Sequence, residues 1–190
     1  MFGISAKIKE RQVIKTNKMV NDLLELTNKQ VLVGVPEEKD PRYIGKGKKK
    51  VLLVESVGNA TLAYIHDNGS PLQNIPARPF MDPGIKQAQD RILPEFMKIA
   101  QDQLSDKKDK IEARFNRIGM ICQASIRNVI NEGEGFTPLK RSTLLGRLRR
   151  RKAARKWTDE RREEVMESFK PLVDSGQLRN SITYVVAEKS

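Results

Sequence analysis

The sequence is poor in the residue types that usually carry catalysis or bind metal ions. Its 190 residues include one cysteine, Cys122, and one histidine, His66. One cysteine supports no intrachain disulfide, and no His or Cys spacing matches a metal site. Cys122 lies in an apolar helical pattern, which is a common setting for a small buried cysteine. We therefore predict no catalytic residue, no metal, no cofactor and no enzymatic activity.

Aromatic residues and long apolar runs are also scarce. Aromatics make up 5% of the chain and hydrophobic residues 38%, so we expect an aliphatic core and some burial through oligomerisation. No stretch approaches 18 apolar residues, and the N-terminus lacks the continuous apolar segment of a secretory signal. These absences predict a protein that folds in a reducing cytoplasm and has no membrane partner.

Positive charge is concentrated in two places. The 36 basic and 24 acidic residues give a net charge of +12. Residues 140–156 contain nine Lys and Arg and no acid, and a second basic loop holds Lys46, Lys48, Lys49 and Lys50. The rest of the chain is nearly neutral, which indicates a local anionic partner. The loop lacks the second glycine and the Lys-Ser/Thr ending of a nucleotide-binding loop, which favours a solvated basic turn.

The segment at residues 140–156 has two interpretations. A run of charge is usually a solvated helix face, but like charges four residues apart, such as Arg147 and Arg151, destabilise a helix unless an anion neutralises them. DNA phosphate, an acidic neighbouring subunit or the acidic run at residues 159–164 would each do so. Only Trp157 adds an aromatic ring, so contacts with DNA should not read sequence. The basic patch comprises Arg147, Arg149, Arg150, Arg151, Lys152, Arg155 and Lys156, and we expect it to stay weakly ordered without its partner.

Hydrophobic periodicity predicts an α+β fold. Apolar residues at helical spacing indicate helices over residues 11–27, 83–104 and 106–131, and Pro94 should kink or divide the second of them. Strands are expected over residues 31–35, 51–55 and 182–187. They would form one small antiparallel or mixed sheet, packed by the long central helices.

The organisation of the chain is predicted to be simple. We expect a single domain over residues 1–190, with an irregular N-terminal arm at residues 1–10. Residues 140–169 form an extended basic insertion in this interpretation, with a few leucines of its first helix as the only apolar anchors.

Residues 61–85 carry the densest local signals. A short helix ends at Gly69, a loop contains three prolines, and a long helix starts near Asp82. Because prolines stiffen the loop, its side chains would lose little entropy on docking to a neighbouring subunit. The alternative is an ordered turn that merely connects two helices. We expect the subunit interface to contain Tyr64, His66, Arg78, Pro79 and Phe80, with Arg78 and Phe80 displayed rather than buried.

Two motifs together resemble the virion-morphogenesis and tail-completion proteins of tailed bacteriophages. The first joins Y-I-H at residues 64–66 to I-P-A-R-P-F at residues 75–80, and the second is K-P-L-V-D-S-G-Q-L-R-N-S-I-T-Y at residues 170–184. Between them, F-T-P-L and S-T-L at residues 136–144 are similar to a third segment of that family, although Phe136 replaces its usual Trp. The order of these pieces makes the resemblance fairly specific.

The resemblance implies a structural protein of the virion neck or tail end, made in the host bacterial cytoplasm. Such a protein would complete or terminate the tail as a ring of identical subunits, expected to be a hexamer. It would join the tail-tube proteins to the head connector. In a DNA-filled channel the basic patch would recur around the ring and contact genomic DNA without sequence preference. The alternative is a free basic protein that coats DNA through residues 140–156.

Overall fold

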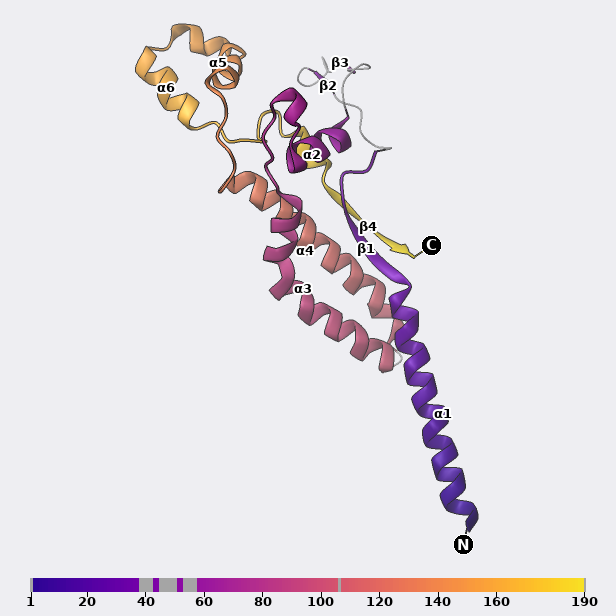
Figure 1. Ribbon diagram of the computed structural model, residues 1–190. Helices are drawn as coiled ribbons and strands as arrows, with labels where there is room; N and C mark the ends of the chain where they lie inside the picture. The colour runs from indigo at the N-terminus through magenta and orange to yellow at the C-terminus, as the bar shows by residue number, and fades with distance from the viewer. Residues whose placement is uncertain (1, 38–42, 45–50, 53–57, 106, 190) are drawn as a thin grey trace. The chain divides into compact units, whose positions relative to one another are not determined.

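The computed structural model describes the backbone of residues 2–37, 43–44, 51–52, 58–105 and 107–189, and the side chains of these residues except 2–11, 43–44, 51–52 and 152. It divides into two compact units. Unit 1 contains Met1–Val33, Ala88–Cys122 and Tyr184–Ser190, and unit 2 contains Gly34–Gln87 and Gln123–Thr183. The long helices α3 (Met81–Leu104) and α4 (Ile111–Glu132) contribute to both units (Figure 1). The single domain over residues 1–190 stays a prediction.

Unit 1 begins with the long helix α1 (Phe2–Thr27). The helix predicted over residues 11–27 is confirmed. Residues 1–10 were expected to be irregular or to form an N-terminal arm. Residues 2–10 are not irregular, because they form the first turns of the same helix, and the arm stays a prediction. The stretch contains no proline and its only glycine is Gly3, so nothing interrupts the propagation of the helix towards the N-terminus.

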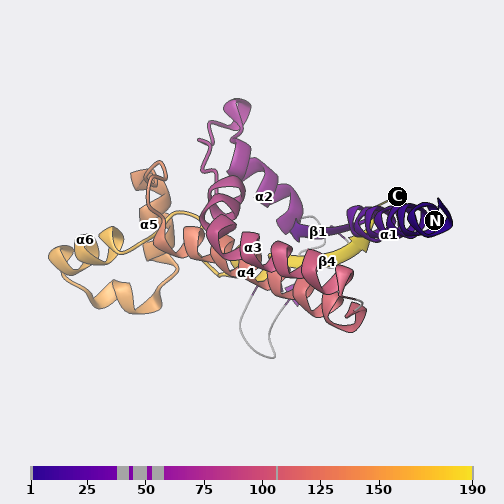
Figure 2. The same cartoon turned by 90° about the horizontal axis from the view of Figure 1, so that it is seen from below.

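The sheet of unit 1 is small and antiparallel. Strand β1 (Lys29–Gly34) pairs with β4 (Thr183–Glu188), and the two run side by side in both views (Figures 1 and 2). Just beyond the strands, the amide of Lys189 donates to the carbonyl of Asn28 over 2.6 Å. These are the first and last of the predicted strands, so their pairing within an α+β fold is confirmed.

The middle predicted strand does not join this sheet. In unit 2, β3 (Val51–Leu52) pairs with β2 (Tyr43–Ile44), and the remainder of the strand predicted over residues 51–55 lies outside the described residues. Pairing two strands that are close in sequence costs less loop-closure entropy than pairing strands that are far apart in the chain. The single three-stranded sheet is therefore a wrong prediction, although each of the three segments contains a strand.

An aliphatic core joins the elements of unit 1. Cys122 is buried there, as predicted, and burial raises the pKa of its thiol. Strand β4 lies so close to α4 that a Cβ on Gly119 would come within 2.2 Å of the Tyr184 ring. Successive side chains of β4 point to opposite faces, since Val186 packs on the core and Val185 is exposed. The buried residues of this core are Ala88, Ile99, Ile111, Phe115, Ile118 and Cys122.

Helix α3 passes Pro94 without a break. Of the two predicted effects of Pro94, division of the helix is wrong, because α3 is continuous over Met81–Leu104, and a kink stays a prediction. Pro94 lacks the amide that would bond to the carbonyl of Asp90, but both residues are exposed, so water reaches that carbonyl. The helix predicted over residues 106–131 is α4, which begins later, at Ile111, after the short 3-10 helix η3 (Lys108–Lys110).

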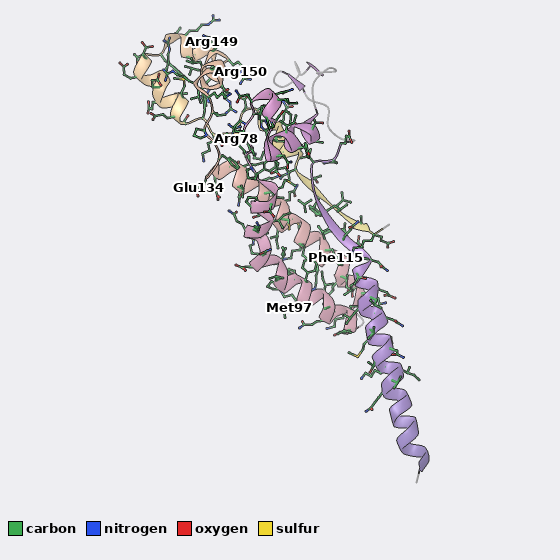
Figure 3. All side chains as sticks on the ribbon, viewed as in Figure 1. Arg78, Met97, Phe115, Glu134, Arg149 and Arg150 are labelled. Carbon is green, nitrogen blue, oxygen red and sulfur yellow. The ribbon has the colours of Figure 1, made fainter. Side chains whose placement is uncertain are left out.

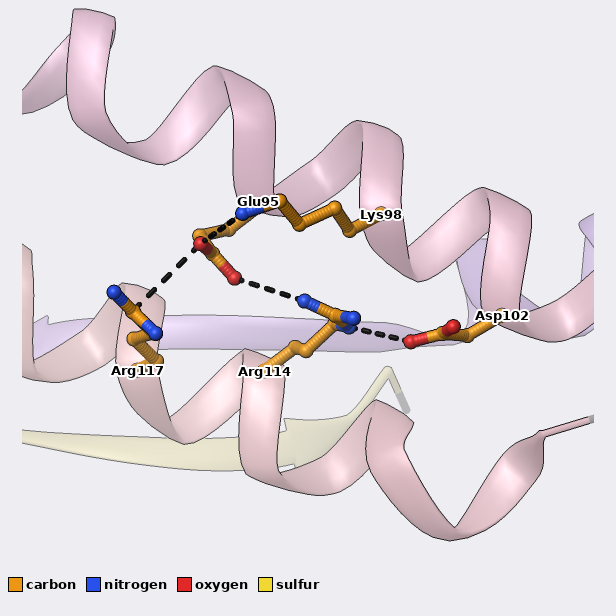
Figure 4. A network of polar contacts seen from close by, with 5 residues as sticks. All are labelled: Glu95, Lys98, Asp102, Arg114 and Arg117. Carbon is orange, nitrogen blue, oxygen red and sulfur yellow. Dashed lines mark hydrogen bonds and ion pairs between the residues drawn. The ribbon is translucent and has the colours of Figure 1, made fainter.

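A network of ion pairs joins α3 to α4 within unit 1 (Figure 4). The Glu95 carboxylate is buried and lies 3.0 Å from Lys98 Nζ, 3.3 Å from Arg114 Nη1 and 3.7 Å from Arg117 Nε. Arg114 also donates through Nε to Asp102. The hydrogen bond from Lys98, assisted by the two arginine charges, lowers the pKa of Glu95 below its ordinary value. The hydrogen bond to Asp102 raises the pKa of Arg114.

We predict a pH-dependent loss of stability when Glu95 is replaced. A lowered folded-state pKa means that ionised Glu95 stabilises the fold at neutral pH and that this contribution disappears as pH falls through the folded-state value. Glu95→Gln should therefore melt below the wild type at pH 7, and the difference should shrink below about pH 4. Thermal unfolding followed by circular dichroism from pH 3 to pH 8 measures this. The control is Glu134→Gln, in an exposed loop, and a difference independent of pH would contradict the prediction.

Unit 2 contains the shorter helices. Gly84 of α3 lies directly against Ile126 of α4, where a Cβ would come within 2.6 Å of the Ile126 backbone. Such a contact requires glycine. The remaining elements are α2 (Asn59–Asn68), the 3-10 helix η2 (Pro71–Gln73), α5 (Arg141–Arg149), the 3-10 helix η4 (Lys152–Lys156), α6 (Asp159–Glu167) and α7 (Gln177–Ser181).

The basic insertion has a hydrophobic core of its own. Leu148 of α5, Ala154 of η4 and Val165 and Met166 of α6 are buried together. The prediction that a few leucines of the first helix are the only apolar anchors is therefore wrong, because α6 supplies the other half of the core. The weak order expected of the basic patch without its partner stays a prediction. The partly buried side chains that pack on it are Leu144, Leu145, Trp157 and Phe169.

Candidate functional site

The loop that follows α2 is closed by its own backbone. Ser70 and Ile75 exchange two hydrogen bonds, of 2.8 and 3.0 Å, and η2 forms the tip between them. Gly69 has a φ of 81°, and a Cβ there would lie 2.8 Å from the amide nitrogen of Ala77. Only glycine fits this position. The loop therefore presents a fixed tip, on which Leu72 is fully exposed.

Arg78 fastens the far end of this loop. Its amide donates to the His66 carbonyl over 2.7 Å, and its guanidinium donates to the carbonyls of Thr137 and Pro138 over 2.8 and 3.3 Å. The residue is 6% exposed, and burial lowers the pKa of its guanidinium. The prediction that Arg78 is displayed is therefore wrong. Its donors satisfy backbone carbonyls of the neighbouring segment instead of reaching solvent.

Phe80 and Asp67 complete the anchor. Phe80 is 0% exposed, so the prediction that it is displayed is also wrong. The Asp67 carboxylate accepts from the amides of Phe80 and Met81 over 2.7 and 3.1 Å, at the start of α3. A carboxylate at a helix N-terminus is favourable because the first amides lack intrahelical partners. The sequence pattern had assigned this end of the helix to Asp82 and could not place Asp67, thirteen residues before Phe80, beside it.

Arg147 of α5 binds the last motif, at residues 170–184. Its Nη1 donates to the carbonyls of Lys170 and Val173, each over 2.8 Å, and its Nε lies 3.9 Å from the Asp174 carboxylate. Burial lowers the pKa of Arg147, and Asp174 opposes that shift. Gly176, with a φ of 78°, lies in the turn before α7.

The loop after α2, the start of α5 and the last motif surround one cleft of about 400 Å³ within unit 2. Its walls come from α2 and the following loop, from the start of α5, and from the turn before α7. The charged lining residues are three cations, Arg78, Lys140 and Arg147, and one acid, Asp174, and Lys140 is the exposed cation among them. Of the predicted interface residues, His66 and Arg78 line it, while Pro79 and Tyr64 are exposed elsewhere on the unit and Tyr64 is 69% exposed. The other lining residues are Leu62, Asn74, Ile75, Pro76, Leu139, Thr143, Leu172, Ser175, Gly176, Gln177 and Leu178.

Some residues of the predicted basic patch contact other parts of unit 2, and most of its described residues are exposed. Arg147 is part of the fold, Arg150 pairs with Asp174 over 2.8 Å, and the Arg151 guanidinium lies 4.7 Å from the centre of the Phe169 ring. The acidic run that was considered as an internal partner reaches the segment through Glu163, which pairs with Arg141 over 2.6 Å. The exposed members of the patch are Arg149, Arg150, Arg151, Arg155 and Lys156, and Figure 3 shows Arg149 and Arg150 at the edge of α5.

A second pocket opens beside these exposed cations. It has a volume of about 430 Å³ and an apolar floor formed by Leu145, Leu148 and Ala154. Four arginines border it, namely Arg149, Arg151, Arg155 and Arg162. The side chain of Lys152 lies outside the described part of the chain, as do Lys46, Lys48, Lys49 and Lys50 of the second basic loop.

Two searches of the described residues gave negative results. No group of three or more His, Cys, Asp or Glu side chains in this part of the chain is placed to hold a metal ion. None of the helices in the described ranges is long and apolar enough to cross a membrane. Comparison with protein-family models, curated proteins and solved structures found no match to this chain.

We predict that the loop anchors are required for folding. Phe80→Ala removes a fully buried ring and should lower the free energy of unfolding by about 3–5 kcal/mol. Arg78→Ala leaves two backbone carbonyls without their donor and should cost about 1–3 kcal/mol. Tyr64→Ala, at an exposed position, should stay within about 0.5 kcal/mol of the wild type. Urea unfolding followed by circular dichroism measures all three, and wild-type stability of Phe80→Ala would contradict the burial of this loop.

Proposed function

We propose that the chain is a structural virion protein of a tailed bacteriophage, forming a ring at the neck or tail end. The ring would complete or terminate the tail and join the tail tube to the head connector. The observation that carries the proposal is the meeting of the three motif segments. Residues 64–80, 136–144 and 170–184 lie far apart in sequence, yet all three line the same cleft of unit 2.

The contacts between the segments explain why the motifs belong together. Arg78, in the motif at residues 64–80, donates to the carbonyls of Thr137 and Pro138 in the segment at residues 136–144. Arg147, three residues after that segment, donates to the carbonyls of Lys170 and Val173 in the motif at residues 170–184. A guanidinium that serves two carbonyls fixes their relative geometry, so each motif depends on the others. The result is a preformed concave surface, as expected of a site that binds an ordered partner.

The exposed surface of unit 2 also suits a protein partner. Tyr64 is 69% exposed and Leu72 is fully exposed on the stiff loop tip. Exposed apolar and aromatic side chains on rigid supports are typical of protein interfaces, because docking costs them little entropy. Lys140, the exposed cation of the cleft, favours a partner segment that carries carboxylates. A connector or tail-tube protein with an acidic loop would fit this description.

We predict that heads and tails made without this protein accumulate without joining. In the phage that encodes the chain, inactivation of its gene should leave DNA-filled heads and separate tails, as seen by electron microscopy. The wild-type gene supplied in trans should restore joined particles, whereas Tyr64→Ala with Leu72→Ala should restore fewer. Because both side chains are exposed, that variant should keep wild-type thermal stability. Normally joined, infectious particles without the protein would overturn the proposal.

Non-specific DNA contact is a second candidate function, supported by the exposed arginines of α5 and η4. We predict that Arg149→Gln, Arg155→Gln and Lys156→Gln together preserve folding and weaken duplex binding at low salt. With fewer phosphate contacts, the slope of log affinity against log salt should fall by up to about three units. Fluorescence anisotropy with two unrelated duplexes measures both the slope and the lack of sequence preference.

Arg147→Gln is the contrasting variant for this experiment. Arg147 holds backbone carbonyls, so its loss should lower stability rather than act on DNA directly. Unchanged affinity and salt slope in the triple variant would show that the patch does not contact DNA.

A further inference from the structure

Helix α1 of unit 1 presents its apolar side to solvent. Five of its apolar side chains are between 37% and 58% exposed, namely Val13, Met19, Val20, Leu23 and Leu24. Figure 1 shows α1 running clear of α3 and α4 over most of its length. Only its C-terminal end is held, where Leu26 packs on the core and Gln103 Nε2 donates to the Asp22 carbonyl over 2.9 Å.

The distribution of charge around α1 is uneven. Over residues 12–27 the charged side chains are Lys15, Lys18, Asp22 and Glu25. At 3.6 residues per turn these four fall within an arc of about 80°, and the rest of the circumference carries no charge. The charged edge is the one that contacts the rest of unit 1, since Glu25 lies 3.3 Å from Lys108 Nζ. A free helix would expose its charges to water, so the uncharged exposed side is suited to burial against protein.

A matching surface lies on α3 of the same unit. Leu93, Phe96, Met97 and Leu104 are between 42% and 67% exposed, and Met97 lies on the outer side of the helix (Figure 3). With Ala100 they form one stripe along the helix. The apolar stripe of α1, over residues 13–24, and that of α3, over residues 93–104, each extend about 17 Å at 1.5 Å per residue. Within one unit neither stripe covers the other, because both are exposed.

We propose that α1 of one copy packs on the α3 stripe of a second copy. The ring of the proposed function would be built in this way, and the inference rests on that function only for the closure of the ring. A contact between two different surfaces of identical subunits is head-to-tail, and it buries both stripes of every copy once the ring closes. Pairing α1 with a second α1 would stop at a dimer and leave the α3 stripe exposed.

The areas involved favour the head-to-tail contact. The largest apolar patch of a monomer is usually about 300–600 Å², whereas a stable interface needs about 800 Å² from each partner. One stripe from each copy is therefore small for a stable dimer, and a single head-to-tail contact buries no more than that. In a closed ring each copy makes two such contacts, through α1 with one neighbour and through α3 with the other, so twice the apolar area is buried per copy. Two helices that pack along apolar stripes in this manner form an ordinary helix–helix interface.

Sedimentation of the full-length chain tests the contact. Wild-type protein should form oligomers that grow with concentration, and Val20→Glu with Leu24→Glu should be monomeric with an unchanged circular dichroism spectrum. Leu93→Glu with Met97→Glu should have the same effect through the other stripe. The matched control is Lys15→Glu with Lys18→Glu, which adds the same number of carboxylates to the charged edge and should still assemble. A wild-type chain that is monomeric at every concentration, or stripe variants that assemble normally, would overturn the proposal.

Disulfide cross-linking identifies which surfaces meet. In a Cys122→Ala background, a mixture of Val20→Cys and Met97→Cys proteins should yield a mixed disulfide dimer under mild oxidation, and Val20→Cys alone should not. Dimers of Val20→Cys alone would show that α1 pairs with α1 and would overturn the proposal. So would binding of a monomeric wild type to anionic phosphatidylglycerol vesicles that the Val20→Glu, Leu24→Glu variant no longer binds. Each of these results leaves the virion role open, whereas normal particles without the protein overturn that role and not this contact.

Discussion

Unit 2 depends on the buried guanidinium of Arg78. The loop between α2 and α3 contains no regular helix or strand beyond the short η2, so most of its backbone groups need polar partners outside such elements. Arg78 supplies them in both directions, through its amide to His66 and through its side chain to Thr137 and Pro138. Because these carbonyls belong to the segment that leads into α5, one side chain sets the position of the loop relative to the cleft. Arg147 performs the same task for the segment that leads into α7.

In unit 1, ion pairs between helices add to the stability that a small apolar core provides. The core is aliphatic and small, and Glu95 joins α3 to α4 through Arg114 at its edge. A buried carboxylate without a partner destabilises a fold, but three cations surround this one. Removing it should therefore destabilise the fold, because the cations would lose their partner. The positive charges of this protein are therefore of two kinds. Some bind carbonyls and carboxylates within the fold, and others, among them Arg149 and Arg155, are exposed.

Much of the fold could be predicted from periodicity, because α1, α3, α4 and the strands β1 and β4 have clear local patterns. The side-chain roles could not. Prolines around Arg78 and Phe80 indicated a stiff loop, but such a pattern does not reveal which side of a loop faces the core. Arg78 is buried because carbonyls some 60 residues later accept its donors, which no local pattern shows. The basic insertion was misjudged similarly, because Val165 and Met166 complete the core begun by Leu148.

The central claim is that the motif segments form a docking cleft of a virion protein. Cross-linking of purified phage particles followed by mass spectrometry tests it most directly, because Lys140 lies on the rim of the cleft. The account predicts cross-links from Lys140 to a head-connector or tail-tube protein. Absence of this chain from purified, infectious particles would contradict the account, and so would particles in which Lys140 becomes linked only to residues of its own subunit.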